Sequence, residues 1–219
     1  MVRSRGATAA ASIDRFVKIV ADHGLVVELP QDMRPWFTTV DPKIALVPGQ
    51  AAPEPMRIPQ ADASRLLKGI IRFVADLPVD ASLVIIWQHD PNELAVDAGS
   101  IDLVCTAGVI TVRLTVTCDQ LERPVTVAVP FGVGRADATR GLLMSSFTRV
   151  DAPPAVAEGW SDAIIAFCWE ALLELATRLS RQAGNDAAGQ PLIPGTIAAD
   201  DGLLIVQPMA RHDLSALTR

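Results

Sequence analysis

The stretch Val109–Cys118, VITVRLTVTC, decides the fold of this chain. Every second position in it is apolar: Ile110, Val112, Leu114, Val116 and Cys118. The positions between them hold threonines, Val109 and Arg113. Successive side chains of a strand point to opposite faces, so one face of this strand is apolar and the other largely polar. The pattern predicts a half-buried strand of an antiparallel sheet with one face in water.

Segments of the same kind lie on both sides of this strand. Strand-like runs extend over about 83–150, with turn signals at 90–92, 98–100 and 107–108. Two helix-like stretches enclose them, at about 61–77 and 155–181, each with an apolar stripe at helical spacing. We therefore expect an α+β fold, an antiparallel β-meander of about five to seven strands with these two main helices packed on one face.

The remaining segments predict one domain with irregular additions. Residues 1–11 are expected to form a flexible leader and 12–219 a single α+β domain, beginning with a short helix and a strand over 25–29. Seven prolines over 30–59 predict an extended segment that wraps the surface. Residues 184–219 are expected to be a loop followed by a terminal strand over 202–207.

Composition excludes several classes of function. The 219-residue chain has a formal net charge of −6, no tyrosine and only 5% aromatic residues. This balance argues against a phosphate-binding or base-stacking surface, so no nucleic-acid partner is expected. No stretch approaches the roughly 18 uninterrupted apolar residues of a membrane helix, so no membrane span is expected. Yet half of the residues are hydrophobic, which favours a large core, a ligand cavity or a subunit interface.

The three cysteines, Cys105, Cys118 and Cys168, have no metal-binding spacing. A hairpin loop at 107–108 would place Cys105 opposite Ile110, too far from Cys118 for a disulfide. Each cysteine lies in an apolar run, which is typical of a small buried hydrophobic residue. Reduced thiols of this kind favour a cytoplasmic protein.

The segment 131–141, FGVGRADATRG, is the first candidate binding site. Glycines let backbone N–H groups approach an anion, and arginines can hold a phosphate or carboxylate. The candidate anion ligands are Gly132, Gly134, Arg135, Asp137 and Arg140. However, Asp137 replaces the third glycine of a dinucleotide fingerprint and there is no P-loop lysine. A solvated hairpin connection is the simpler interpretation, and no cofactor is expected.

His89 followed by Asp90 is the second candidate, because a histidine beside a carboxylate can act as a general base or a ligand. The other two histidines, His23 and His212, show no metal-binding spacing with it, so no metal is expected. No catalytic residue can be assigned. An enzyme would have to assemble its site from distant residues such as His89, Asp90, Arg113, Arg135 and Asp137.

The third candidate is an apolar helix surface rather than a chemical motif. The last helix carries a wider apolar arc than one sheet face requires, with interface candidates Trp160, Ile164, Phe167, Trp169 and Leu173. The helix over 61–77 carries a similar surplus between Leu66 and Leu77. Core packing is the simplest interpretation. A dimer or partner interface, or the wall of a hydrophobic pocket, is the functional one.

The order of elements over about 25–181 resembles a helix-grip (START-like) arrangement, in which a curved sheet holds a long C-terminal helix over a cavity. The proline-rich segment and the strand after residue 189 depart from it. The first hypothesis is a non-catalytic cytosolic interaction or assembly protein that uses an apolar helix face for homo-oligomerisation or partner docking. The alternatives are a carrier or sensor of an apolar small molecule, as the resemblance implies, and an enzyme with a dispersed site.

Overall fold

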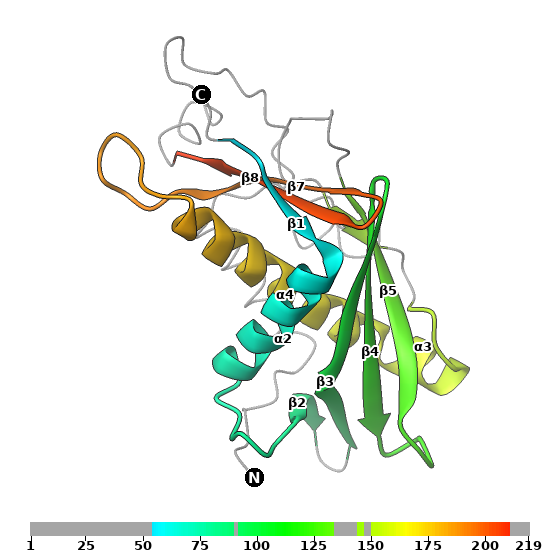
Figure 1. Ribbon diagram of the computed structural model, residues 1–219. Helices are drawn as coiled ribbons and strands as arrows, with labels where there is room; N and C mark the ends of the chain where they lie inside the picture. The colour runs from blue at the N-terminus through cyan, green and yellow to red at the C-terminus, as the bar shows by residue number, and fades with distance from the viewer. Residues whose placement is uncertain (1–53, 90–91, 134–143, 147–149, 211–219) are drawn as a thin grey trace.

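The computed structural model describes residues 54–89, 92–133, 144–146 and 150–210, which form two antiparallel sheets and three helices (Figure 1). The five-stranded sheet has the order β2 (Leu83–His89), β3 (Asn92–Thr106), β4 (Val109–Cys118), β5 (Val125–Val133) and β6 (Met144–Ser146). The three-stranded sheet has the order β1 (Met56–Pro59), β8 (Leu203–Met209) and β7 (Ile193–Asp200). The helices are α2 (Gln60–Val74), α3 (Pro154–Gly159) and α4 (Ser161–Gln182).

The five-stranded sheet confirms the predicted antiparallel meander. Cys105 of β3 lies opposite Ile110 of β4, the register expected from a hairpin loop at 107–108. The apolar set of β4 is buried, whereas Arg113 between them is exposed. Alternation therefore gave the correct inner and outer faces of the central strand. The α+β class is confirmed as well.

The turn expected at 98–100 is wrong, because β3 runs through it with a register shift between Asp97 and Asp102. Ser100 bridges the irregularity, since its hydroxyl donates to the Asp97 carbonyl at 2.7 Å and accepts from the Thr115 N–H at 2.7 Å. Ala98 is fully buried. Small polar residues in this stretch therefore mark a bulge in one long strand and not its end.

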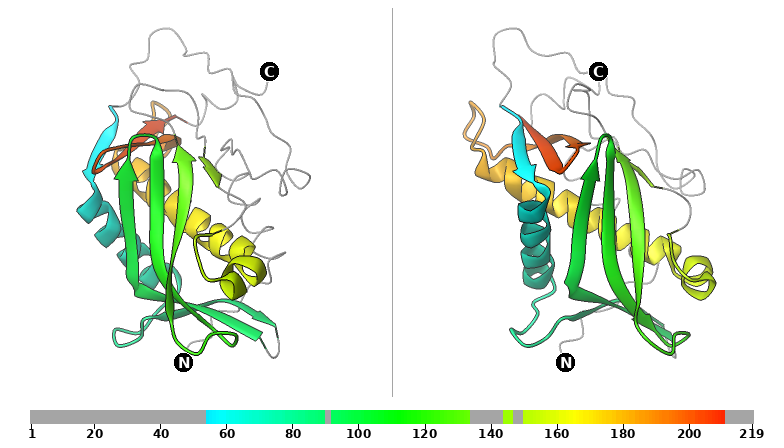
Figure 2. Two further views of the ribbon diagram at one scale, coloured as in Figure 1. Left: turned by 90° about the vertical axis from the view of Figure 1, so that its right-hand side faces the viewer. Right: turned by 45° about the vertical axis from the view of Figure 1, so that its right-hand side comes forward.

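Both long helices lie on the same side of the five-stranded sheet (Figures 1 and 2). β2 pairs with β3 only over residues 92–97, so the other half of this edge of β3 has no neighbouring strand. α2 lies along that half. Its side chains satisfy this open edge: the Leu103 N–H donates to Ser64 Oγ, and the Cys105 N–H donates to Gln60 Oε1 at 3.0 Å. The helix therefore caps a sheet edge as well as covering a face.

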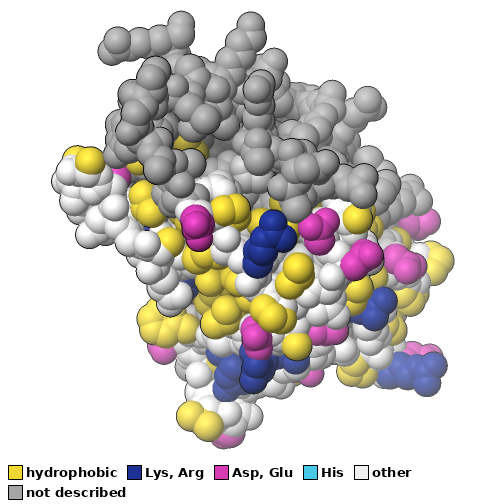
Figure 3. All heavy atoms as spheres, turned by 45° about the horizontal axis from the view of Figure 1, so that its top comes forward, with side chains coloured by type: hydrophobic (Ala, Val, Ile, Leu, Met, Phe, Trp, Pro, Cys, Tyr) yellow, Lys and Arg dark blue, Asp and Glu magenta, His cyan; other side chains and the backbone are white. Residues whose placement is uncertain are grey.

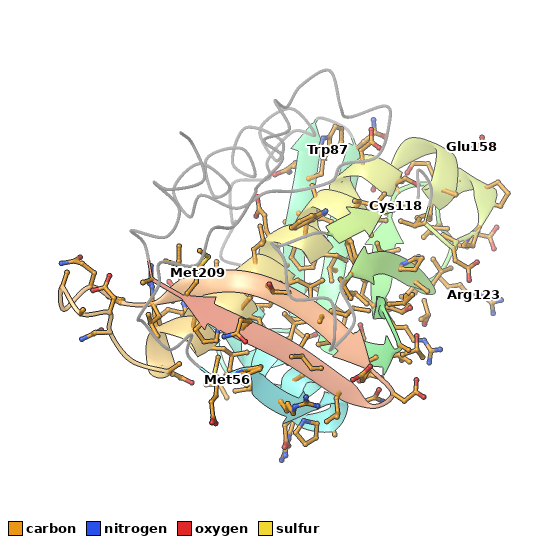
Figure 4. The ribbon with its side chains drawn as sticks, turned by 90° about the horizontal axis from the view of Figure 1, so that it is seen from above. Met56, Trp87, Cys118, Arg123, Glu158 and Met209 are labelled. Atoms are coloured by element: carbon orange, nitrogen blue, oxygen red, sulfur yellow. The ribbon has the colours of Figure 1, made fainter. Side chains whose placement is uncertain are left out.

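The three-stranded sheet was only partly foreseen. The terminal strand expected over 202–207 is β8, but β7 and β1 were not predicted. β7 contains Pro194 and Gly195, and it is buried at nearly every position, so it shows no alternation. Gly195 lies against Met209 of β8, where an added Cβ would be 2.9 Å from its sulfur. Met56 and Met209 mark this sheet in Figure 4, away from Trp87 and Cys118.

The tip of the β3–β4 hairpin joins the two sheets. Gly108, at a φ of 77°, donates its N–H to the Ala199 carbonyl of β7 and accepts from the Val133 N–H of β5. The Gly202 N–H, in the β7–β8 turn, donates to the Cys105 carbonyl. A positive φ is strained for residues with a Cβ, so glycine suits this junction.

The helix expected over 155–181 has the predicted extent but is interrupted at Trp160, which separates α3 from α4. The Ser161 hydroxyl donates to the Ala157 carbonyl and accepts from the Val150 N–H, which stabilises the interruption. α4 contacts α2 and strands of both sheets. These contacts explain why its apolar arc is wider than one sheet face requires.

Several expected features lie outside the described residues. They are the leader 1–11, the short helix, the strand over 25–29 and the proline-rich segment up to residue 53.

Candidate docking surface

The anion-binding and histidine candidates lie largely outside the described residues. Gly132 is in β5, opposite Val109 and Ser145 of the neighbouring strands. His89 ends β2, opposite Asn92. Not described are Asp90, Gly134, Arg135, Asp137 and Arg140. The described residues contain no group of three or more histidine, cysteine or acidic side chains that could hold a metal ion.

The interface candidates on α4 are mostly inside the protein. Four of them are buried and belong to the core, namely Trp160, Ile164, Trp169 and Leu173, and Phe167 is partly buried. Trp160 stacks edge-on against Trp87 of β2, with ring centroids 4.7 Å apart. These four side chains belong to the hydrophobic core and do not form an exposed surface.

The outer face of α2 carries the apolar surplus that remains exposed. Ala63, Leu67, Ile70 and Ile71 face the core and are buried. Leu66 and Phe73, two turns apart on the outer side, are 42% and 71% exposed. Residues seven apart lie on one helix face, so these two side chains form one stripe. Exposed apolar side chains continue beyond it, at Val74, Val79 and Leu83.

Phe73 is held from one side by a charged pair on α4. The Arg178 guanidinium lies 4.8 Å from the centre of the Phe73 ring, a cation–π contact. Glu174 fixes this arginine, because Arg178 Nε donates to Glu174 Oε1 at 2.7 Å. The ring is therefore positioned although most of it is exposed to solvent. Aromatic side chains, phenylalanine among them, are enriched in protein interfaces relative to the rest of the surface.

The loop after α2 is held by Arg72. Its guanidinium donates to the carbonyl oxygens of Pro78, Val79 and Ala81, at 2.8, 3.0 and 2.8 Å. Three hydrogen bonds from one planar group fix the path of the loop. The Val79 side chain, 98% exposed, is thus presented on a constrained backbone. A constrained surface loses less entropy when a partner binds.

Gly69 lies between Leu66 and Phe73 on the outer side of α2. It is exposed, and an added Cβ would meet nothing within 4 Å. Glycine within a helix costs about 1 kcal/mol of stability relative to alanine. Internal packing does not require it here. The outer side of the helix is therefore open between the two apolar side chains.

The basic residues of α2 lie to one side of this stripe, whereas Asp62, four residues before Leu66, lies in line with it. Arg65, Lys68 and Arg72 recur at helical spacing and form a second row, and Asp62 is the one acidic residue of the helix. Arg65 pairs with Asp62 in an exposed ion pair. In the space-filling view, hydrophobic side chains lie among separate basic and acidic ones on the described surface (Figure 3). Sequence reasoning did not separate these two rows.

Burial makes the thiols of Cys105 and Cys168 weak nucleophiles. All three cysteines are free and buried. Burial raises the pKa of Cys105 to about 11 and also raises that of Cys168. A thiol that keeps its proton at neutral pH is a weak nucleophile.

No described helix is long and apolar enough to cross a membrane.

No family model, no curated protein and no solved structure matches this chain.

Proposed function

We propose that this protein is a non-catalytic cytosolic interaction protein that docks a partner through the outer face of α2. The observation that carries the proposal is the exposed apolar stripe of Leu66 and Phe73 on an ordered helix. Buried, reduced cysteines support the cytosolic location. The carrier and enzyme alternatives have no comparable support among the described residues.

The free energy available from burying these two side chains supports a docking role over accidental exposure. Burying a leucine or phenylalanine side chain contributes about 1.5–3 kcal/mol. Single exposed apolar residues are common on protein surfaces, but a cluster usually marks an interaction site. Here Leu66 and Phe73 lie on one stripe, with Val74 next to it at the end of the helix. The contacts of Arg178 and Arg72 hold this surface in a fixed shape before a partner arrives.

Site-specific photocrosslinking in living cells tests the proposal. Benzoylphenylalanine is placed at Gly69 in the stripe or at Thr126, an exposed position on the wet face of β5. We expect discrete crosslinked species from position 69 that disappear when Leu66→Ser and Phe73→Ser are added. Native mass spectrometry then tells whether the bound species is a second copy or another protein.

Both serine substitutions are at exposed positions, so the variant is expected to fold like the parent protein. Equal crosslinking at positions 69 and 126, or crosslinks at 69 that survive the double substitution, would contradict the proposal.

A further inference from the structure

The inference concerns the chemistry of the partner and rests on the proposed function of α2. We infer that the docking surface receives an acidic amphipathic segment of another protein. Its apolar side chains would cover Leu66 and Phe73, and its carboxylates would lie along Arg65, Lys68 and Arg72.

The charge of α2 differs from that of the whole chain. The protein has a formal net charge of −6, yet α2 carries three basic residues and one acidic one. Arg65, Lys68 and Arg72 are three and four residues apart, so they form one row along the helix. Successive helix residues point about 100° apart, so the row lies roughly a quarter turn around the helix from the apolar stripe, with the exposed Gly69 between them. An apolar stripe with a basic flank matches a partner with the opposite flank.

Two members of the row lack a carboxylate partner in the described part of the chain. Lys68 makes no ion pair there, and Arg72 donates only to carbonyl oxygens of the following loop. Carbonyl groups fix the position of Arg72 but do not neutralise its charge. Arg65 is paired with Asp62, but this pair is exposed and contributes little to stability. Positive charge is therefore available for a partner's carboxylates.

A second copy of this chain fits the surface less well. In a two-fold symmetric antiparallel pair of α2 helices, the same flank of each helix lies on the same side of the contact. The basic row of one copy would then lie beside the basic row of the other, and like charges would oppose association. A hydrophobic stripe alone permits self-association, but this charge pattern disfavours the antiparallel pair.

An anionic membrane surface also fits less well. Asp62, Asp76 and Asp80 lie on or next to the surface, and Glu174 borders Phe73 through Arg178. A uniformly negative bilayer would repel these carboxylates. A folded segment can place its own charges between them.

The test measures binding of three fluorescent helical peptides to the full-length protein by anisotropy. The peptides share leucines at helical spacing and differ only in one flank, which carries glutamate, glutamine or lysine. We expect the glutamate peptide to bind at least about tenfold more tightly than the lysine peptide, and this preference to weaken between about 50 and 300 mM salt. The same protein is tested against vesicles of phosphatidylserine and phosphatidylcholine.

A charge exchange makes the test specific. In the variant Arg65→Glu/Lys68→Glu, both changes are near or at the surface, and Arg72 keeps its contacts with the loop. We expect this variant to prefer the lysine peptide, while Leu66→Ser/Phe73→Ser binds neither. Restored binding between exchanged partners would identify the basic row as the determinant.

The other outcomes separate the two levels of the proposal. Equal affinity for the three peptides, lost in the Leu66→Ser/Phe73→Ser variant, overturns the acidic partner but keeps the docking surface. Affinity that this variant retains overturns both. Binding of phosphatidylserine vesicles without binding of the glutamate peptide replaces the partner protein by a membrane, and a dimer that forms through α2 replaces it by a second copy.

Discussion

The backbone N–H of Leu103 donates a hydrogen bond of 2.9 Å to the hydroxyl of Ser64, a residue 39 positions earlier in the chain. The same hydroxyl donates to Asp102 Oδ1 at 2.7 Å. The buried Ser64 side chain of α2 thus accepts a backbone hydrogen bond that a neighbouring strand would otherwise accept at this edge of β3. The helix that carries the exposed Leu66 and Phe73 on its outer side is thus fixed to the sheet by its inner side.

Removing the Ser64 hydroxyl should lower the free energy of unfolding, although the substitution deletes only one atom. Ser64→Ala would leave the Leu103 N–H buried without a partner, and we expect the free energy of unfolding to fall by about 1–3 kcal/mol. Urea denaturation measures the change. Ser82→Ala is the matched control, because within the described part of the chain its backbone carbonyl, and not its hydroxyl, forms a hydrogen bond, and it should change stability by less than about 0.5 kcal/mol. Equal effects would mean that the edge is not held by Ser64.

Two glycine-to-alanine substitutions should change the stability of the protein in opposite directions. Gly69→Ala adds a Cβ in open space on a helix and should stabilise the protein by about 0.5–1 kcal/mol. Gly195→Ala would bring a Cβ within 2.9 Å of the Met209 sulfur and 3.1 Å of its Cβ, and should destabilise by about 1–3 kcal/mol. Thermal unfolding of both variants measures the pair. A stable Gly195→Ala protein would mean that β7 and β8 are less closely packed than described.

Thr177 and Ser180 of α4 are buried, and their hydroxyl oxygens have no hydrogen-bond partner in the described part of the chain. A buried unsatisfied hydroxyl costs about 1–3 kcal/mol. Thr177→Val keeps the shape and removes this cost, so we expect the variant to be more stable. Thr126→Val, at an exposed position, controls for the change in composition. A loss of stability in Thr177→Val would contradict an unsatisfied hydroxyl at this position.

The buried thiols predict a dependence on pH. Burial raises the pKa of Cys105 to about 11, so above the ordinary thiol pKa of about 8.5 the unfolded chain loses a proton that the native state keeps. The free energy of unfolding should therefore fall as the pH rises from about 8.5 to about 11. It should fall less steeply in the Cys105→Ala variant. At pH 8, a thiol reagent should modify the three cysteines rapidly only in denaturant. Rapid modification of the native protein would contradict their burial.

Removing the Arg72 guanidinium should release the loop that follows α2. Arg72→Met loses three hydrogen bonds to carbonyl oxygens, and we expect faster amide exchange and proteolysis over 75–82. Stability should fall by about 1–3 kcal/mol. Arg65→Met, which loses only an exposed ion pair, is the control. An unchanged loop would show that contacts other than Arg72 determine its path.

Local patterns predicted those parts of the fold that have one face in water. β4 alternates because the helices cover only one side of it, and Arg113 marks the other. α4 and β7 are buried on nearly all sides, so their residue patterns do not indicate which neighbours surround them. The same limit applies to the site. Apolar surplus occurs on both long helices, and only the packing of α4 between two sheets distinguishes its core residues from the exposed Leu66 and Phe73 of α2.

The pairing of β1 with β8 has a consequence for how the protein folds. Met56 lies opposite Val206, and among the described strands β1 pairs only with β8. On the ribosome, β1 therefore emerges long before the strand that completes its sheet. Contacts between residues so distant in sequence form slowly, because a long loop must close first. Until β8 is made, the three-stranded sheet next to the first turn of α2 is incomplete. Apolar residues of α2 are then exposed to chaperones and to aggregation.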